Sequence, residues 1–546
     1  MSTNIISRPI ANFHPCHWGD HFLNITHHDQ ETVIQKEQEV QKLKVRVGEL
    51  LRATKEPQNQ ITLIDTLERL GVAYHFENEI DETLKSSFES FLSDCENADL
   101  NNVSLRFRIF RQHGFYVPSD VFNKFKEDQN GRFKESLASD VQGMLSLFEA
   151  SHVRVHDDKI LDEALAFATP HLETMAKELS SPLGEQVAHA LHQPLHLGMP
   201  RVEARFYISI YEKDPSHDEL LLHFAKVDFN FVQSLHQKEL KDLKRWWKGL
   251  HMKASYSRDR ITEAFFWIVG VYFEPKFAFA RKLFGKVFKS TTLTDDTYDA
   301  YGTLDELKLL TQAFQRPWNK DVAKELPDHV KWGYYAFVET CEEVEEELAK
   351  EGRAFCAGYL RQQVIDLSKE YMQEAEWCHQ NYVPTYEEYM KNALVTSPYP
   401  LGTIASFLGM GEIASEEYFR WASQKPIPDI IRAASTILRL MNDMGGHKFE
   451  QSRKHVASAV QCVMEHKKVS ENEANEILSK EVEDAWKLIN QAMLQPYVIP
   501  KLLLTRILNL ARSAHVIYHG TNDGFTHVNQ TLKDKVDSVF ARPISM

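Results

Sequence analysis

Residues 276–299 read KFAFARKLFGKVFKSTTLTDDTYD, and they follow Pro275. A proline is tolerated where a helix begins, so the stretch predicts a helix that starts after Pro275 and ends at its aspartates. Asp295 and Asp299 are four residues apart and therefore lie on one face, about one turn from each other. The two carboxylates repel each other and the negative end of the helix macrodipole. We therefore expect a positively charged partner at this helix end.

A magnesium ion would meet this need. Magnesium binds one or two protein carboxylates, keeps several waters and completes its shell with phosphate oxygens of a substrate. The alternative is an exposed acidic helix end that holds no ligand. Because the chain has 78 acidic residues, a DDxxD pattern can also arise by chance, and a second observation is needed to decide.

A second polar cluster supplies that observation. Asn442, Gly446 and Glu450 are spaced at i, i+4 and i+8, on one face of a helix predicted after Pro428. Two such faces on separate helices could converge across a cavity. The Gly445-Gly446 pair costs roughly 1 kcal/mol per residue inside a helix, so we expect close approach of a water or an ion there, with a helix kink as the alternative.

The rest of the chain is also predicted to be helical. It has 546 residues, of which 43% are hydrophobic, and this is enough for two or three domains. No stretch alternates apolar and polar residues for long enough to predict a sheet. Helical spacing of apolar residues is found over 31–51, 60–72, 81–95, 135–149 and 158–179, and further helices are predicted over 259–274, 303–314, 327–350, 353–380, 383–394, 429–450 and 453–467.

The best domain boundary lies at Asp214-Pro215. Ser216 and Glu219 then form a capping-box pattern that opens a long helix. We therefore expect an all-α fold of two α-helical domains, residues 1–215 and 216–546.

Charge and cysteine usage narrow the functional class. The formal net charge of −15 argues against a nucleic-acid binder, because the chain as a whole repels polyanions. The longest strongly apolar run, 264–273, is shorter than the ~20 residues that a bilayer span needs, so no membrane span is expected. The six cysteines include no CxxC pair and are typical of reduced thiols in a cytosolic protein.

Five ordered blocks of sequence resemble plant class I terpene synthases of the sesquiterpene type, and the resemblance covers almost the whole chain. It implies a C-terminal class I terpenoid synthase fold and an N-terminal α-barrel relic domain, without the Asp-x-Asp-Asp pattern needed for protonation-initiated cyclisation. The blocks are Arg258-Asp259-Arg260, the aromatic block at 265–275, Asp295-Asp296-Thr297-Tyr298-Asp299, Tyr371-x-x-Glu374-Ala-x-Trp377 and Asn442-Asp443-x-x-Gly446-x-x-x-Glu450, followed by Tyr518 and Asp523-Gly524.

The resemblance implies three Mg²⁺ ions, for which Mn²⁺ is a substitute. Asp295 and Asp299 would bind two of them, and Asn442 and Glu450 would bind the third. Asp296 would support these ligands without binding metal. Gly446 stands where the family usually has Ser or Thr, so the resemblance implies a water in place of the hydroxyl ligand.

The substrate implied by the resemblance is a prenyl diphosphate. Arg258 and Arg439 match the arginines that grip the diphosphate, and Arg260 is a further candidate; a planar guanidinium donates bidentately to phosphate and keeps its charge. Trp267 matches a pocket position against the substrate chain, and Tyr518 with Asp523 resembles a pair proposed to move protons. Other aromatic candidates for the pocket are Tyr371, Tyr399, Phe407 and Phe525.

The expected reaction depends on how the site would stabilise the charges of the leaving diphosphate and of the carbocation. Three divalent ions and two arginines would stabilise the departing diphosphate, so the allylic C–O bond breaks without a protein nucleophile and leaves a carbocation. Aromatic rings can stabilise that cation while water is excluded. Two further segments resemble parts of the family's site, namely a helix break at Thr396-Ser397-Pro398 and a closing loop from His519 to Thr526.

The N-terminus bears on compartment and substrate. Arg8-Pro9, with Trp18 ten residues after Arg8, resembles a family motif whose strand folds over the active-site mouth. Only seven residues precede it, too few for a plastid transit peptide, so we expect a cytoplasmic monomer. Within the family that location implies farnesyl diphosphate. His189, His192 and His196 are read as packing residues and not as a zinc site.

Three alternatives stay open. A monoterpene or acyclic terpene synthase that uses geranyl diphosphate would share every metal residue. A chain-elongating prenyltransferase would want a second aspartate-rich motif, which the stretch from Asn442 to Glu450 does not supply. A non-catalytic helical scaffold would tolerate loss of Asp295.

Overall fold

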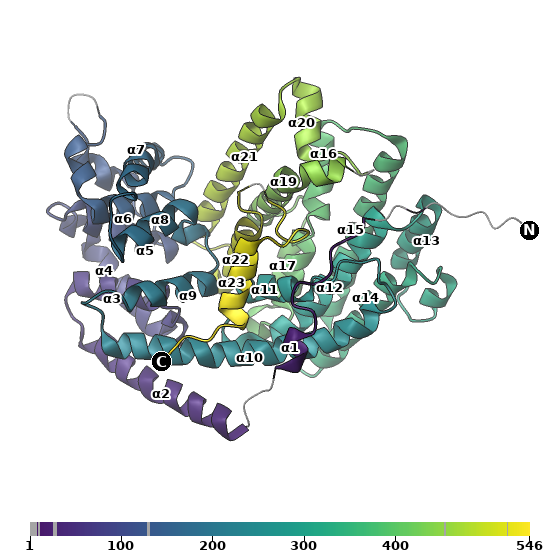
Figure 1. Ribbon diagram of the computed structural model, residues 1–546, viewed down its shortest axis with the longest axis horizontal. Coiled ribbons are helices and arrows are strands. Elements are labelled where there is room, and N and C mark those ends of the chain that lie inside the picture. The colour runs from purple at the N-terminus through teal and green to yellow at the C-terminus, as the bar shows by residue number, and fades with distance from the viewer. Residues whose placement is uncertain (1–7, 9–10, 26–29, 128–130, 453–454, 521) are drawn as a thin grey trace, which may run out of the picture. The chain divides into compact units, whose positions relative to one another are not determined.

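The computed structural model describes the chain except residues 1–7, 9–10, 26–29, 128–130, 453–454 and 521. The regular elements in the described residues are all helices, joined by loops (Figure 1). The one isolated β-bridge that these residues form pairs Lys126 with Phe133. The predicted all-α fold is thus confirmed. Among the described residues, no helix combines the length and the apolar character required to cross a membrane.

Contacts divide the chain into two compact units. The larger unit contains Met1–Ile25, His236–Trp486 and Leu502–Val536, and the smaller unit contains Thr26–Leu235, Lys487–Lys501 and Asp537–Met546. This division assigns the N-terminal segment to the larger unit and cuts a long helix between Leu235 and His236. The division between the two units therefore does not coincide with the expected domain boundary at 215/216, and that boundary stays a prediction.

The helices begin and end as follows. Up to the long helix they are α1 (His21–Asn24), α2 (Gln30–Ala53), α3 (Pro57–Arg69), α4 (Glu77–Asp94), α5 (Leu100–Gln112), α6 (Val141–Ser151), α7 (Lys159–Met175), α8 (Leu183–His192), α9 (Pro200–Tyr211) and α10 (Glu219–His251). The later ones are α11 (Ile261–Val271), α12 (Ala278–Ala300), α13 (Leu304–Gln315), α14 (Lys331–Ala349), α15 (Phe355–Gln380), α16 (Tyr386–Thr396), α17 (Tyr399–Phe407), α18 (Glu416–Ala422), α19 (Asp429–Gln451), α20 (Ala459–Lys467), α21 (Glu471–Ala492), α22 (Lys501–Ile517) and α23 (Gln530–Phe540).

The start of α10 differs in detail from the expected capping box. Asp218 caps the helix, since its carboxylate accepts hydrogen bonds from the backbone N–H of Leu220 at 2.8 Å and of Leu221 at 3.1 Å. Ser216 instead donates its hydroxyl to Asp214 at 2.7 Å. Because the helix begins at Glu219, Asp218 stands at the N-cap position, and the hydroxyl of Ser216 is already used by Asp214.

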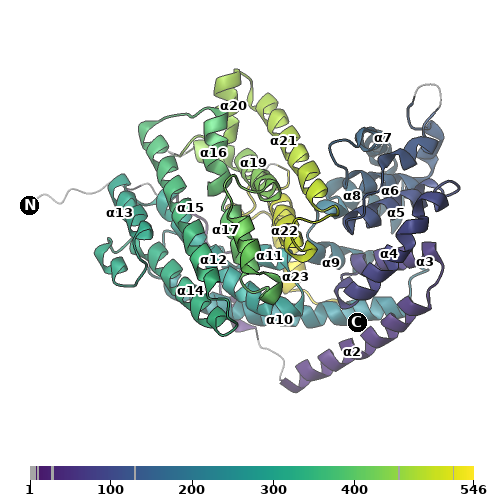
Figure 2. The ribbon, with the colours of Figure 1, turned by 180° about the vertical axis from the view of Figure 1, so that it is seen from behind.

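The core of the larger unit holds the two helices that carry the acidic clusters. α12 packs against α11, α14, α15 and α17, and α17 also packs against α19, so α17 joins the two (Figure 2). α11 is buried along its whole length, as expected for a helix that is apolar all round. The loop after α17 comes close to α12 at Gly409, where a Cβ atom would lie 2.4 Å from the Cα of Ala280.

In the smaller unit two of the three predicted packing histidines, His189 and His196, have packing partners, whereas His192 is exposed. His189 contacts Glu203 at 2.6 Å and stacks on Phe206, and His196 contacts Asn490 at 2.8 Å. These contacts give both rings a partner within the helical core of that unit.

Candidate active site

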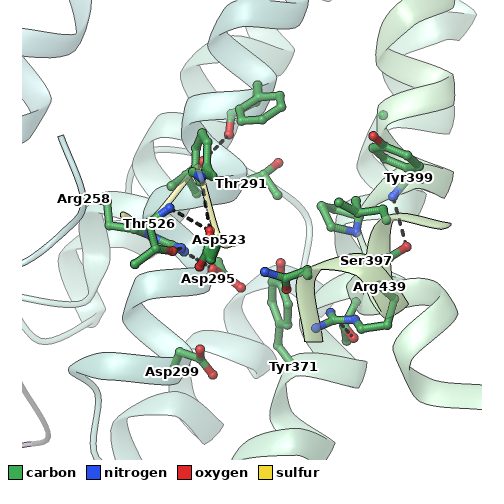
Figure 3. Close-up of a pocket in the computed structure, with 18 of the residues that line it drawn as sticks. Arg258, Thr291, Asp295, Asp299, Tyr371, Ser397, Tyr399, Arg439, Asp523 and Thr526 are labelled. Carbon is green, nitrogen blue, oxygen red and sulfur yellow. Dashed lines mark hydrogen bonds and ion pairs between the residues drawn. The ribbon is translucent and has the colours of Figure 1, made fainter. Parts of the chain in front are cut away.

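One cavity in the larger unit brings the two predicted polar faces together. Asp295 and Asp299 reach it from α12, and Asn442 and Glu450 reach it from α19. Its volume is about 150 Å³, counted as space for the centres of water molecules. Figure 3 shows Asp295 beside Arg258, Asp523 and Thr526, with Arg439 across the cavity. The wall also includes Arg258, Arg439, Trp267, Tyr371, Tyr399, Tyr518, Asp523 and Phe525, and it omits Asp296, Gly446, Arg260 and Phe407.

The carboxylates at the polar end are in contact with an arginine and a histidine. Arg258 forms an ion pair with Asp295, and His455 lies 2.7 Å from Asp299 and 3.8 Å from Glu450. His455, which sequence reasoning missed, thus joins the two acidic clusters. It lies in the loop after α19, and its only sequence signal was closeness to Glu450. Among the described residues, no ready group of three His, Cys, Asp or Glu side chains forms a metal site by itself.

Burial strongly affects these carboxylates. Desolvation raises the pKa of Asp295 to about 6, with repulsion from Asp299 and Asp296 acting in the same direction and Arg258 opposing it. Desolvation likewise raises the pKa of Glu450 to about 7. Buried carboxylates whose pKa values are raised would be stabilised in their ionised form by additional positive charge. Hard oxygen donors of this kind suit a magnesium ion. The donor set therefore fits the expected cation.

Asp296 and Arg260 lie outside the cavity wall. Asp296, only 1% exposed, accepts hydrogen bonds from the segment before α11. Arg260 donates to the backbone carbonyls of His14, Phe525 and Thr526, each at 3.0 Å. Its guanidinium is committed to joining three chain segments, which differs from the expected contact with diphosphate.

Arg439 is held on the other side of the cavity by a chain of hydrogen bonds. It donates to the hydroxyl of Thr396 at 3.1 Å and lies 3.5 Å from Asp443. Thr396 in turn donates to Glu374 at 2.6 Å. Burial raises the pKa of Glu374 to about 8, against the attraction of Arg439. Glu374 was quoted as part of a motif but given no role, because its burial is invisible in the sequence.

The apolar end of the cavity is aromatic. Trp267, at 3% exposure, meets Tyr399, Tyr518 and Phe525 edge-on, with ring centroids 6.3, 5.9 and 5.8 Å away. Phe288 lies 5.5 Å from the same ring. Such rings present negative faces that can stabilise positive charge without providing a nucleophile.

Two loops complete the wall. α16 ends at Thr396 and α17 begins at Tyr399, so the expected helix break is present, and Ser397 and Pro398 line the cavity. The loop after α22 is organised by Asp523, which accepts hydrogen bonds from the backbone N–H of Phe525 at 3.1 Å and Thr526 at 2.8 Å.

The first glycine of the pair in α19 has a different explanation from the expected one. The helix runs through both residues, and a Cβ atom at Gly445 would lie 2.8 Å from the backbone carbon of Asn522. Close approach of the Asn522–Asp523 backbone, and not of a water or an ion, requires glycine at 445. A Cβ atom at Gly446 would lie 3.1 Å from the carboxylate of Glu450.

The N-terminal segment also reaches the cavity. Phe13 lines it and lies 5.1 Å from the guanidinium of Arg258. Arg8 forms a bidentate ion pair with Glu306, with both N···O distances at 2.7 Å. Pro9, the other residue of the expected motif, lies outside the described residues.

Comparison with known proteins identifies the two halves of the chain. Residues 17–191 match the terpene synthase N-terminal domain, and residues 248–488 match the metal binding domain of the terpene synthase family. The chain is 48% identical to a probable sesquiterpene synthase of Santalum murrayanum, over 99% of this chain and 97% of the relative. It is also 48% identical to (-)-germacrene D synthase of Vitis vinifera, over 99% and 96%.

Two solved structures are also similar to this chain over most of its length. Limonene synthase with 2-fluorolinalyl diphosphate aligns with a TM-score of 0.92 and 30% identity, over 99% of this chain and all of that one. Isoprene synthase from grey poplar, in complex with three Mg²⁺ ions and dimethylallyl-S-thiolodiphosphate, aligns with a TM-score of 0.85 and 35% identity, over 93% and 97%.

Proposed function

Since the chain belongs to the terpene synthase family, whose members are lyases acting on prenyl diphosphates, we propose that it is a sesquiterpene synthase. It would ionise farnesyl diphosphate and release a sesquiterpene hydrocarbon or alcohol together with diphosphate. One observation carries the proposal: a single cavity has carboxylates from two distant helices at one end and aromatic rings at the other.

The polar end is the proposed metal site. Asp295 and Asp299 would hold two Mg²⁺ ions, and Asn442 and Glu450 would hold the third. Bound there, the ions would neutralise the diphosphate and make it a better leaving group. At Gly446 the side chain provides no oxygen, so water would complete the shell on that face. The metal binding domain match and the three Mg²⁺ ions in the isoprene synthase complex support this assignment.

Two arginines would hold the diphosphate between them. Arg258 approaches from the segment before α11, and Arg439 approaches from α19 on the opposite wall. Each guanidinium keeps its charge although burial opposes it, because Asp296 and Asp295 raise the pKa of Arg258 and the surrounding Tyr389, Asp443 and Glu374 raise that of Arg439 above the usual value. The resting ion pair of Arg258 with Asp295 would then give way to contact with the diphosphate.

The aromatic end would guide the cation. Trp267 lines the cavity from the buried helix α11, and its edge-on neighbours Tyr399, Tyr518 and Phe525 line the same cavity. Burial raises the pKa of Tyr518 well above its usual value, so the phenol stays neutral and provides no phenolate to trap a carbocation. We assign Tyr518 and Asp523 to proton movement during cyclisation.

Farnesyl diphosphate is the proposed substrate because relatives that match nearly the whole chain are named sesquiterpene synthases. Geranyl diphosphate is the second candidate, favoured by the close structural match to limonene synthase. Cytoplasmic location, a monomeric state and the domain boundary at 215/216 remain predictions.

The test is incubation of purified protein with geranyl, farnesyl and geranylgeranyl diphosphates and Mg²⁺, with volatiles identified by gas chromatography and mass spectrometry. We expect sesquiterpenes from the farnesyl substrate and loss of all volatiles in Asp295→Ala and Asn442→Ala. Unchanged yields in these variants would reject the metal-ligand assignment. A higher kcat/KM for geranyl diphosphate would favour the monoterpene alternative.

A further inference from the structure

The middle carboxylate of the 295–299 cluster has no contact with the cavity, although its two neighbours in the motif line it. Asp296 is one residue, and therefore about 100°, away from Asp295 around α12. This rotation turns it from the cavity toward residues 256–260, the segment that precedes α11. Its burial to 1% exposure leaves the carboxylate dependent on protein partners.

Those partners all belong to the segment that carries Arg258. One oxygen of Asp296 accepts the hydroxyl of Ser257 and the backbone N–H of Arg258, each at 2.8 Å. The other oxygen lies 2.7 Å from the Nε atom of Arg258. The carboxylate thus holds both the backbone and the side chain of the same arginine.

Further contacts fix the same segment to the same face of α12. Lys289, two turns before Asp296, is buried and donates to the carbonyl of Arg258 at 3.1 Å. The hydroxyl of Tyr256 lies 2.8 Å from that of Thr297. α12 therefore presents Asp295 and Asp299 to the cavity and a separate row of polar groups to the Arg258 segment.

The three nitrogens of the Arg258 guanidinium contact three different partners. Its Nε edge faces Asp296, while Nη2 pairs with Asp295 and Nη1 donates to Thr526 at 3.1 Å. When cations occupy the site at Asp295, the contact of Nη2 is freed but the anchor at Nε remains. The terminal nitrogens are then presented to the cavity in a fixed orientation, as bidentate recognition of a phosphate requires.

We propose that Asp296 is a positioning residue, which orients Arg258 for diphosphate binding and takes no part in holding metal. This inference rests on the proposed function, because it assumes that Arg258 contacts the diphosphate. It gives the three aspartates of the motif two different tasks, and it connects the motif to the Arg-x-Arg segment 37 and 38 residues earlier.

The experiment measures inhibition by inorganic pyrophosphate in the presence of Mg²⁺, using the full chain and its variants Asp296→Asn, Arg258→Ala and the double variant. We expect the inhibition constant to rise by about tenfold or more in Asp296→Asn, as for loss of one partner of the buried ion pair with Nε of Arg258. In the Arg258→Ala background, Asp296→Asn should add almost nothing, because the group that it orients is gone. The Mg²⁺ concentration for half-maximal activity should stay within about twofold of the parent value, whereas Asp295→Asn should raise it strongly.

Three results would overturn the proposal. The first is an additive effect in the Arg258→Ala background, and the second is a shift in Mg²⁺ dependence as large as that of Asp295→Asn. The third is a lowered melting temperature with an unchanged inhibition constant, which would mark a merely structural role. If Asp296→Asn does not fold, Ser257→Ala removes one donor to the same carboxylate and should raise the constant by about threefold, again only when Arg258 is present.

The proposed function fails in a different way. An Arg258→Ala variant that binds pyrophosphate as tightly as the parent would show that Arg258 does not grip the diphosphate, and would overturn both statements. Normal sensitivity to Arg258→Ala together with indifference to Asp296→Asn would overturn the positioning role alone.

Discussion

Acidification from pH 8 to pH 6 should weaken magnesium binding by the substrate-free protein, by roughly tenfold for the ion assigned to Glu450 and by roughly twofold for those assigned to Asp295. Two of the proposed ligands are carboxylates whose pKa values are raised by burial, to about 6 for Asp295 and about 7 for Glu450. At pH 6 the first is about half protonated and the second about nine-tenths protonated, whereas at pH 8 each is about nine-tenths ionised or more. Because the metal needs the ionised forms, its affinity rises with pH through this window.

The assay is calorimetric titration of the protein with Mg²⁺ at pH 6, 7 and 8, without diphosphate, so that protonation of the ligand does not contribute. Repeating the titration at pH 7 in two buffers of different ionisation enthalpy counts the protons released on binding. The matched control is Glu450→Gln, which cannot be protonated at that position. It should bind more weakly than the parent at pH 8 and show a smaller change between pH 8 and pH 6.

Equal affinities at pH 6 and pH 8 in the parent protein would refute the reasoning, because they would mean that neither carboxylate must lose a proton to bind metal. Release of no protons at pH 7 would contradict it independently.

Three further outcomes are expected. Gly402→Ala should raise the preference for geranyl over farnesyl diphosphate by about tenfold in a competition assay. Gly402 lines the cavity, and a methyl group there meets only ordinary contacts at 3.8 Å or more, so it fits and takes space from the substrate's prenyl chain. An unchanged ratio would place the prenyl chain elsewhere. Arg8→Ala should lower the free energy of unfolding in a denaturant titration by about 1–3 kcal/mol. The side chain of Glu306 is only 13% exposed in the structure, and the substitution removes its bidentate partner. Glu263→Gln should stabilise the protein at pH 8 by up to about 3 kcal/mol and leave its stability unchanged at pH 4.5. Burial raises the pKa of Glu263 to about 7, so the folded parent loses stability as the pH rises from about 4.5 to 7. Thermal unfolding at the two pH values checks this, and equal shifts of the melting temperature at both would contradict the prediction.

The sequence predicted those features that depend on local spacing. The helix after Pro275 was expected over 276–299 and is found as α12, Ala278–Ala300, preceded by a short 3-10 turn at Pro275–Phe277. The polar face of α19 was read from the same kind of spacing, i to i+4 to i+8. Helical period determines which residues share a face, so these sets could be assigned without the fold.

Features that depend on distant segments could not be predicted. His455 meets Asp299 across 156 residues of chain, and only tertiary packing brings the two together. Gly445 looked like a site for a water or an ion, because the approach of the Asn522–Asp523 backbone leaves no mark on the residues around the glycine. Arg260 belongs to a motif that suggested phosphate contact, yet its guanidinium donates to three carbonyls on two other segments of the chain, those of His14, Phe525 and Thr526.

The pairing at the polar end bears on the order of events in the site. Arg258 pairs with Asp295 and His455 contacts Asp299, so the groups proposed to grip the diphosphate and to hold metal lie against each other. Cations at the carboxylates would release Arg258, and a diphosphate that captured Arg258 would release Asp295. Each ligand therefore removes a competitor of the other, and by linkage each must raise the affinity for the other by the same factor. Such coupling would make the site bind the two ligands together more tightly than either one alone, so that the diphosphate would be held most firmly when the cations are in place.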